Sequence, residues 1–156
     1  MNILLQAALL SLLPFTELRL SIPLAIALGE NSFYVFLACT LANILVIPIV
    51  FIFLNFMHSR LMNSKTYSEA FGLLLRRIRP KSENMREKIE LIGLPALTLF
   101  VAIPLPATGA YTGTIIAWLL NLNYKKSFFA IAAGVIIAGI IVTALSTGII
   151  TAFNSF

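Results

Sequence analysis

Hydrophobic residues in this chain gather into apolar runs separated by short polar stretches. Two runs, Phe33–Met57 and Ser127–Thr151, contain no charged residue and are long enough to cross a hydrocarbon core of about 30 Å with some tilt. Four other runs are about half as long, at about 1.5 Å per helical residue; they cover 3–13, 17–28, 91–103 and 109–120. Pro95 is expected to interrupt the third of these. The pattern predicts an all-α integral membrane protein.

Two helix-breaking knots separate the short runs within each pair. The first knot is the stretch 13–19 (LPFTELR), and the second knot is the stretch 103–113 (IPLPATGAYTG). Proline lacks a backbone N–H and clashes with the preceding turn, so neither pair of runs can form one straight helix. Thr16 and Thr108 are the predicted N-caps of the helices that leave the knots. The prolines at the predicted hairpin tips are Pro14, Pro104 and Pro106.

The two halves of the chain resemble each other when one is shifted by 92 positions. The shift places Pro14 on Pro106, Thr16 on Thr108, and Asn31 on Asn123. Each half then consists of two short helices followed by one long span, a repeated pattern that is typical of transporters. We predict a single membrane domain over 1–156, made of repeat 1 (3–57), a linker (58–90) and repeat 2 (91–153).

The linker holds most of the charge. Its apolar residues recur at helical spacing opposite basic ones, which predicts an amphipathic helix lying along the membrane interface and ending at Pro80. The apolar face is Tyr67, Phe71, Leu74, Leu75 and Ile78, opposite Lys65, Arg76, Arg77 and Arg79. Because basic segments favour the cytoplasmic side of a membrane, we expect this linker in the cytoplasm.

Two topologies fit these runs. If both knotted pairs crossed the membrane fully, the chain would have four spans, and Lys125 and Lys126 would share the outer side with Glu30. If both pairs are re-entrant hairpins, the lysines share the cytoplasmic side with the linker, and the two repeats are inverted. The positive-inside tendency favours the hairpins. Their tips would meet near the middle of a cell membrane (plasma or inner), where irregular backbone must be buried in protein or line a cavity.

Composition agrees with a membrane protein and narrows the chemistry. The 156 residues are 60% hydrophobic and 11% charged, with a net charge of +5 and a mean hydropathy of +0.98. A soluble domain of this length would need more polar surface. With one histidine, no aspartate and no nucleotide-binding glycine loop, we expect neither an enzyme nor ATP-driven transport. The lone Cys39 excludes an internal disulfide. We expect no cofactor, no metal and no nucleic-acid partner.

The first knot also contains two charged residues, Glu17 and Arg19, between apolar stretches. Charges at membrane depth are costly and usually functional. Arg19 suits phosphate or carboxylate, helix N-termini favour anions, and Glu17 could take up a proton. The predicted substrate-binding residues are Thr16, Glu17, Arg19, Thr108, Gly109, Tyr111, Thr112 and Gly113. Alternatively, Glu17 and Arg19 neutralise each other or hold the hairpins together, although residues two apart on a helix do not face each other.

Two stretches carry a resemblance to a known family. Glu17–Pro23 (ELRLSIP) and Phe100–Gly113 (FVAIPLPATGAYTG) resemble the signature stretches of the small multidrug export protein family, which is distantly similar to the DedA (SNARE-associated, VTT-type) membrane proteins. The resemblance covers nearly the whole chain. It implies re-entrant hairpins and, through the DedA relationship, movement of lipids such as polyprenyl phosphates across the bilayer. The chain departs from the Pro-x-Pro-x-Glu pattern of DedA proteins.

These observations leave one main functional hypothesis and two alternatives. The main hypothesis is a transporter or flippase for an anionic amphiphile, such as a lipid or polyprenyl phosphate, bound between the two hairpins. The alternatives are an exporter of small hydrophobic drugs and a non-transporting structural or assembly protein of the membrane. Membrane lipids are the expected partners. Two spans and two hairpins enclose little space, so we also expect a homo-oligomer, a dimer or larger.

Overall fold

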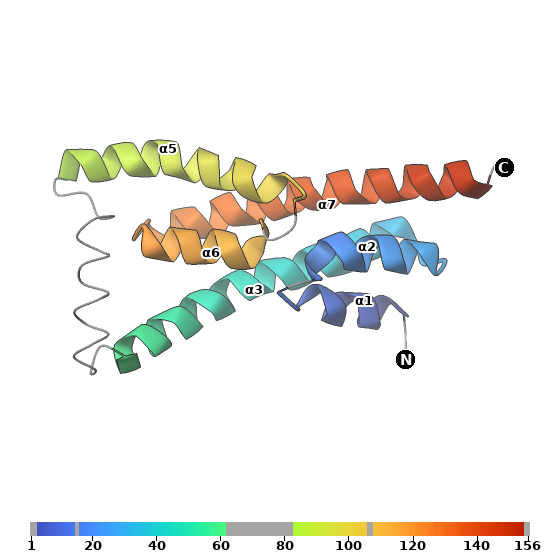
Figure 1. The fold of residues 1–156 in the computed structure, drawn as a ribbon, viewed down its shortest axis with the longest axis horizontal. Helices are drawn as coiled ribbons and strands as arrows, with labels where there is room; N and C mark the ends of the chain where they lie inside the picture. The colour runs from blue at the N-terminus through green and yellow to red at the C-terminus, as the bar shows by residue number, and fades with distance from the viewer. Residues whose placement is uncertain (1–2, 15, 62–82, 106–107, 155–156) are drawn as a thin grey trace.

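The computed structural model describes residues 3–14, 16–61, 83–105 and 108–154, and it is helical throughout with no strand in these ranges (Figure 1). The described helices are α1 (Ile3–Ser11), α2 (Glu17–Ala27), α3 (Ser32–Leu61), α5 (Glu83–Ala102), α6 (Ala110–Leu119) and α7 (Tyr124–Asn154). The predicted all-helical class is therefore confirmed for the described residues. The predicted amphipathic helix in the linker and the predicted hairpin-tip residue Pro106 lie outside them.

The two long helices, α3 and α7, pack against each other and run in opposite directions. Near one end, Thr147 late in α7 bonds to Ser32 at the start of α3. Near the other end, Tyr124 at the start of α7 stacks edge-on against Phe51. Ser32–Arg60 and Tyr124–Ala152 are each long and apolar enough to cross a membrane. They match the two predicted spans.

The four shorter helices form two hairpins on this pair. Helices α1 and α2 contact each other and lie along one half of α3 and α7, and α5 and α6 lie along the other half (Figure 1). Helix α2 contacts both long helices, and so does α6. The two knots consequently meet about halfway along the molecule.

The polar turns lie at opposite ends of the molecule. The turn before α7 contacts α5, where Lys126 forms a 2.8 Å ion pair with Glu90 and the backbone N–H of Asn123 donates to the same carboxylate. The turn at Glu30 lies where α2 ends and α3 begins. We call the first the Lys125 end and the second the Glu30 end.

These two turns repeat the same hydrogen bonds 92 positions apart. The left-handed residue is Gly29 (φ 90°) in one and Asn121 (φ 53°) in the other. The following N–H bonds back to the helix, Glu30 to Ala25 and Leu122 to Ala117. Each long helix is then capped by an asparagine side chain: Asn31 accepts from the N–H of Phe33, and Asn123 accepts from that of Lys125. The sequence match between the halves thus extends to backbone geometry.

Two local predictions were wrong. Helix α5 is continuous through Pro95, which was expected to interrupt it. It packs along α7, and this packing holds the helix across the one hydrogen bond that the proline removes. Thr16 occupies the N-cap position of α2, as predicted, but its side chain makes no capping hydrogen bond, and Thr108 is not the N-cap residue of α6. The Thr16 hydroxyl instead donates to the carbonyl of Leu10, and Gly109 occupies the N-cap position of α6.

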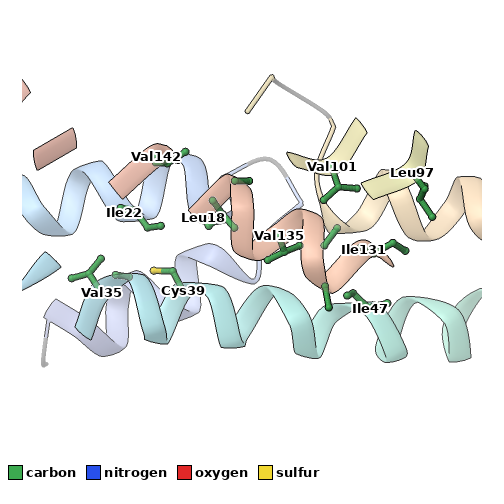
Figure 2. Close-up of a cluster of buried hydrophobic side chains, with 14 of the residues drawn as sticks. Leu18, Ile22, Val35, Cys39, Ile47, Leu97, Val101, Ile131, Val135 and Val142 are labelled. Atoms are coloured by element: carbon green, nitrogen blue, oxygen red, sulfur yellow. The ribbon is translucent and has the colours of Figure 1, made fainter. Parts of the chain in front are cut away.

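A buried apolar core joins α2, α3, α5 and α7, and Figure 2 shows its central side chains. Cys39 is fully buried within it. Small residues allow α7 to approach its neighbours closely: a Cβ at Gly134 would lie 2.7 Å from the carbonyl oxygen of Thr98, and one at Gly139 would lie 2.8 Å from Oγ1 of Thr40. Gly134 therefore fits α7 against α5, and Gly139 fits it against α3.

The outer surface is apolar on every described helix. Large side chains such as Ile52, Leu91 and Phe129 are 68%, 75% and 71% exposed. A soluble monomer seldom leaves so much apolar surface in water, whereas hydrocarbon solvates it readily. The surface agrees with the hydropathy of the sequence.

Candidate functional site

The first knot turns the chain sharply at Glu17. Its φ of 41° is in the left-handed region, which a residue with a side chain rarely adopts. The backbone N–H of Glu17 bonds to the carbonyl of Leu13 at 3.0 Å, so the turn is held by the knot itself. Such strained residues cluster at functional sites and are maintained by surrounding contacts.

The side chain of Glu17 contacts the second hairpin. It is buried, with 6% of its surface exposed, and its carboxylate lies against Gly109, where any Cβ would overlap it. The backbone N–H of Tyr111 favours the negative charge of this carboxylate. Glu17 therefore caps the N-terminus of α6 from the opposite hairpin, where its negative charge meets the positive end of the helix dipole.

Arg19 extends to α5, the other helix of the second hairpin. Its Nη2 donates to Oγ1 of Thr108 at 2.9 Å and lies 3.3 Å from the carbonyl oxygen of Ile103, just past the end of α5. A cation suits that end of a helix, where carbonyl groups are unpaired. No ion pair joins Glu17 to Arg19, as expected for residues two apart. Glu17 instead faces the N-terminus of α6, the positive end of that helix dipole. Arg19 faces the C-terminus of α5, the negative end of its dipole.

The hydroxyls of the second knot complete the junction. Tyr111 donates to the carbonyl of Leu12, the residue just before the first knot. The Thr108 hydroxyl lies 2.9 Å from the carbonyl oxygens of Ile103 and Leu105 while it accepts from Arg19. The two hairpins are thus bonded in both directions, from Arg19 to the second hairpin and from Tyr111 to the first.

Two nitrogens of Arg19 remain without a partner. Its Nε and Nη1 are enclosed and make no hydrogen bond, although a guanidinium carries five N–H donors. Leaving such donors unpaired away from water is unfavourable. Pro23 adds to the local imbalance: it has no N–H, so the carbonyl of Arg19 lacks its usual helical partner.

A groove of about 440 Å³ begins at Arg19. One wall is Pro23 and Ala27 on α2, and Pro104 of the second knot borders the groove. The opposite wall is formed by the α7 residues Val142, Leu145, Ser146, Ile149 and Ile150. Arg19 is the one charged residue of this lining, and the groove is otherwise almost entirely apolar. We call it the Arg19 groove.

A second groove of about 490 Å³ lies toward the Lys125 end, lined by Glu90, Leu91, Leu94, Pro95 and Lys126. Its cation is already paired, since Lys126 binds Glu90 at 2.8 Å. An anion entering this groove would have to compete with that carboxylate. The Arg19 groove is therefore the better candidate for anion binding.

The structure brings some of the predicted site residues together and separates others. Glu17, Arg19, Thr108, Gly109 and Tyr111 meet at the junction of the knots, but of these only Arg19 lines the groove. The Thr16 hydroxyl is engaged by its own knot. Gly113 serves helix packing, because a Cβ there would lie 2.7 Å from Cγ2 of Val101. Thr112 is half-buried on α6 and does not line the groove.

Sequence reasoning missed the walls of the groove. Pro23, Ala27 and Ser146 lie in apolar runs where nothing distinguishes them chemically. A proline four residues after Arg19, on the same face of the helix, was the one available signal. It marks both a missing hydrogen bond and a surface beside the charge.

The arrangement can hold an anionic head group beside a hydrophobic tail. Arg19 supplies the charge and unpaired donors, and the groove supplies an apolar surface. Arg19 Nε and Nη1 are enclosed in this conformation, so an anion reaches them only with a small displacement of the side chain.

Comparison with known proteins gives one match. The model of a family described as "Putative small multi-drug export protein" matches residues 17–141. The matched residues include Glu17 and Arg19 of the first knot and all of the second knot. No curated protein and no solved structure matches the chain.

Proposed function

The chain belongs to the small multi-drug export protein family, and from that premise we propose that it is a membrane transporter that moves an anionic amphiphile across the bilayer. Arg19 holds the anionic group, and the Arg19 groove holds the apolar part. The observation that carries this proposal is the position of Arg19: a cation with two unpartnered nitrogens at one end of an apolar groove. Charges at membrane depth are rare unless they serve a site.

Re-entrant hairpins and inverted repeats are part of this proposal. Three observations support them: the knots meet halfway along two antiparallel long helices, the polar turns lie at opposite ends, and those turns have matching hydrogen bonds 92 positions apart. Inverted repeats place a transporter's site at their interface, near the midplane. With the positive-inside tendency, the Lys125 end and the linker face the cytoplasm of a cell membrane.

The family name and the resemblance to DedA proteins suggest different substrates, small drugs in the first case and lipid phosphates in the second. Export of small drugs and movement of a lipid phosphate both need an apolar surface, but only an anionic substrate makes use of Arg19. We therefore favour a phosphate or carboxylate head group. A homo-oligomer, a dimer or larger, would complete a pathway that one chain with two spans only begins.

A structural role is the competing proposal, and one observation favours it. Glu17 packs against the second hairpin and Arg19 bonds to it, so they could serve only to hold the hairpins together. In that case no substrate is needed. Glu17 fits this reading better than Arg19 does, because the bonds of Arg19 leave two of its nitrogens unused.

Flux in proteoliposomes tests the function. The full chain is reconstituted with a fluorescent alkyl phosphate, and transfer between leaflets is followed by quenching from outside. We expect flux in the wild type and none above protein-free vesicles in Arg19→Ala. The matched control is Leu20→Ala, a neighbouring side chain that is 60% exposed and outside the groove, which should keep wild-type flux. Equal flux in Arg19→Ala and Leu20→Ala would show that Arg19 is structural.

A further inference from the structure

We infer that the Arg19 groove takes an amphiphile with a single chain, and takes it head first. The anionic group lies at Arg19 in the middle of the molecule, and the tail runs back along α2 and α7 toward the Glu30 end. This inference rests on the proposed function and names its substrate class and binding direction.

The direction follows from where the lining residues lie. Arg19, Pro104 and Val142 are at the inner end, next to the junction of the knots. Ala27 is the last residue of α2, and Ile149 and Ile150 lie beyond Thr147, which bonds to Ser32 at the Glu30 end. The groove therefore runs from the middle of the molecule to one end of it.

Polarity along the groove allows only one orientation. The charged residue is at the inner end, and the outer part is aliphatic except for Ser146. The Ser146 hydroxyl already donates to the carbonyl of Val142 at 2.7 Å. A head group at the outer end would meet no free donor within the lining, whereas one at the inner end reaches the unpartnered nitrogens of Arg19 once that side chain is slightly displaced.

Shape limits the tail to one chain. The wall from Arg19 to Ala27 covers two helical turns, or about 12 Å. A volume of about 440 Å³ is in the range of pockets for one small ligand. Lipid tails are as apolar as the groove, so burial there brings little hydrophobic gain over the bilayer, and fit decides. The second chain of a two-chain lipid would have to leave the groove.

This polarity is also opposite to that of a lipid in the leaflet at the Glu30 end. Such a lipid has its head at the surface and its tails toward the middle. The groove has its charge in the middle and its apolar wall toward the surface. A slender molecule can enter along its own axis, but a two-chain lipid would have to turn over first.

Tail-directed labelling tests the orientation. The probe is 10-maleimidodecanoate, a carboxylate whose thiol-reactive group is at the tip of the tail. In a Cys39→Ala background of the full chain, one cysteine is placed at the outer end (Ala27→Cys) and, separately, one at the inner end (Val142→Cys). Uncharged N-ethylmaleimide gives the intrinsic reactivity of each thiol. After this correction we expect at least tenfold faster labelling of Ala27→Cys, and loss of the preference when Arg19→Ala is added.

Competition tests the number of chains. Hexadecyl phosphate and dipalmitoyl phosphatidic acid both carry a phosphate monoester, one on a single chain and one on two chains. We expect hexadecyl phosphate to slow the labelling of Ala27→Cys and phosphatidic acid at the same membrane concentration to leave it unchanged. Equal protection by phosphatidic acid overturns the single-chain inference. Faster labelling of Val142→Cys, if it depends on Arg19, overturns the head-first inference.

These outcomes are distinct from a failure of the proposed function. If Arg19→Ala changes neither labelling nor the flux of the alkyl phosphate, the transport site itself is wrong. If labelling and flux both depend on Arg19, the transport site stands. Faster labelling of Val142→Cys than of Ala27→Cys would then show that the binding direction is wrong, and protection by phosphatidic acid would show that the single-chain substrate class is wrong.

Discussion

The carboxylate of Glu17 lies directly against Gly109, and these two residues occupy equivalent positions in the two halves of the chain, 92 positions apart. If the two halves are related by a two-fold axis, as proposed above, equivalent residues contact each other only close to that axis. The contact thus places Glu17 at the centre of the junction. It also explains why residue 109 has no side chain: the space is filled by the opposite hairpin.

The first prediction concerns this contact. Gly109→Ala should lower the free energy of unfolding by about 1–3 kcal/mol, because the added methyl overlaps the Glu17 carboxylate. The backbone is not the cause, since the φ of −91° at Gly109 is open to alanine. Gly148→Ala is the matched control. It has nothing within 4 Å and should be neutral or up to about 1 kcal/mol more stable. Denaturation in one detergent compares them, and equal stabilities would contradict the contact.

A second prediction concerns the bond from Tyr111 to the carbonyl of Leu12. Tyr111→Phe should cost about 1 kcal/mol of stability, because it leaves that carbonyl without its donor. Transport should persist, since Tyr111 does not line the groove. Tyr34→Phe, at a side chain that is 59% exposed, should change neither property. Loss of flux at wild-type stability in Tyr111→Phe would place this hydroxyl in the transport path instead.

The third prediction separates charge from geometry at Arg19. Arg19→Lys should retain transport at roughly a tenth of the wild-type rate, equivalent to about 1.4 kcal/mol. An ammonium keeps the charge, but it cannot bond Thr108 and Ile103 in the guanidinium arrangement and also bind an anion. The flux assay measures this, with protein yield and monodispersity as the control for folding. Full activity of Arg19→Lys would mean that charge alone is sufficient.

The fourth prediction separates coupling from architecture at Glu17. Glu17→Gln keeps the size of the side chain and an oxygen that can accept from the N–H of Tyr111, so stability should change by no more than about 1 kcal/mol. If Glu17 carries a proton, this variant loses the pH dependence of flux and still binds the alkyl phosphate. Flux measured across pH at fixed substrate is the readout. An unchanged pH profile would leave Glu17 with the role of a helix cap.

The fifth prediction concerns orientation in the membrane. In a Cys39→Ala background, the thiol of Glu30→Cys should react with an impermeant maleimide from outside, and that of Lys125→Cys only from inside. Lys125 is a suitable position because its neighbour Lys126, not Lys125 itself, pairs with Glu90. Labelling of Lys125→Cys from outside would remove the re-entrant topology, whatever the substrate.

Sequence alone determined the elements of this fold, because the signals involved are local. Apolar runs place each end of α3 and α7 to within four residues, and the prolines and polar turns mark where α1, α2, α5 and α6 end. The match of Asn31 with Asn123 predicted a repeat whose turns have the same hydrogen bonds. Pro95 shows the limit of local signals: its helix continues because tertiary packing offsets one missing bond.

Tertiary structure alone decided what the charged residues do. Sequence placed Glu17 and Arg19 in one knot but could not show that they contact the two helix ends that meet at the second knot, since partners 84 to 92 positions away depend on how the hairpins meet. The groove was equally out of reach. Its walls are mostly aliphatic residues of α2 and α7, and they form a groove only because packing places them beside Arg19 and leaves space between them.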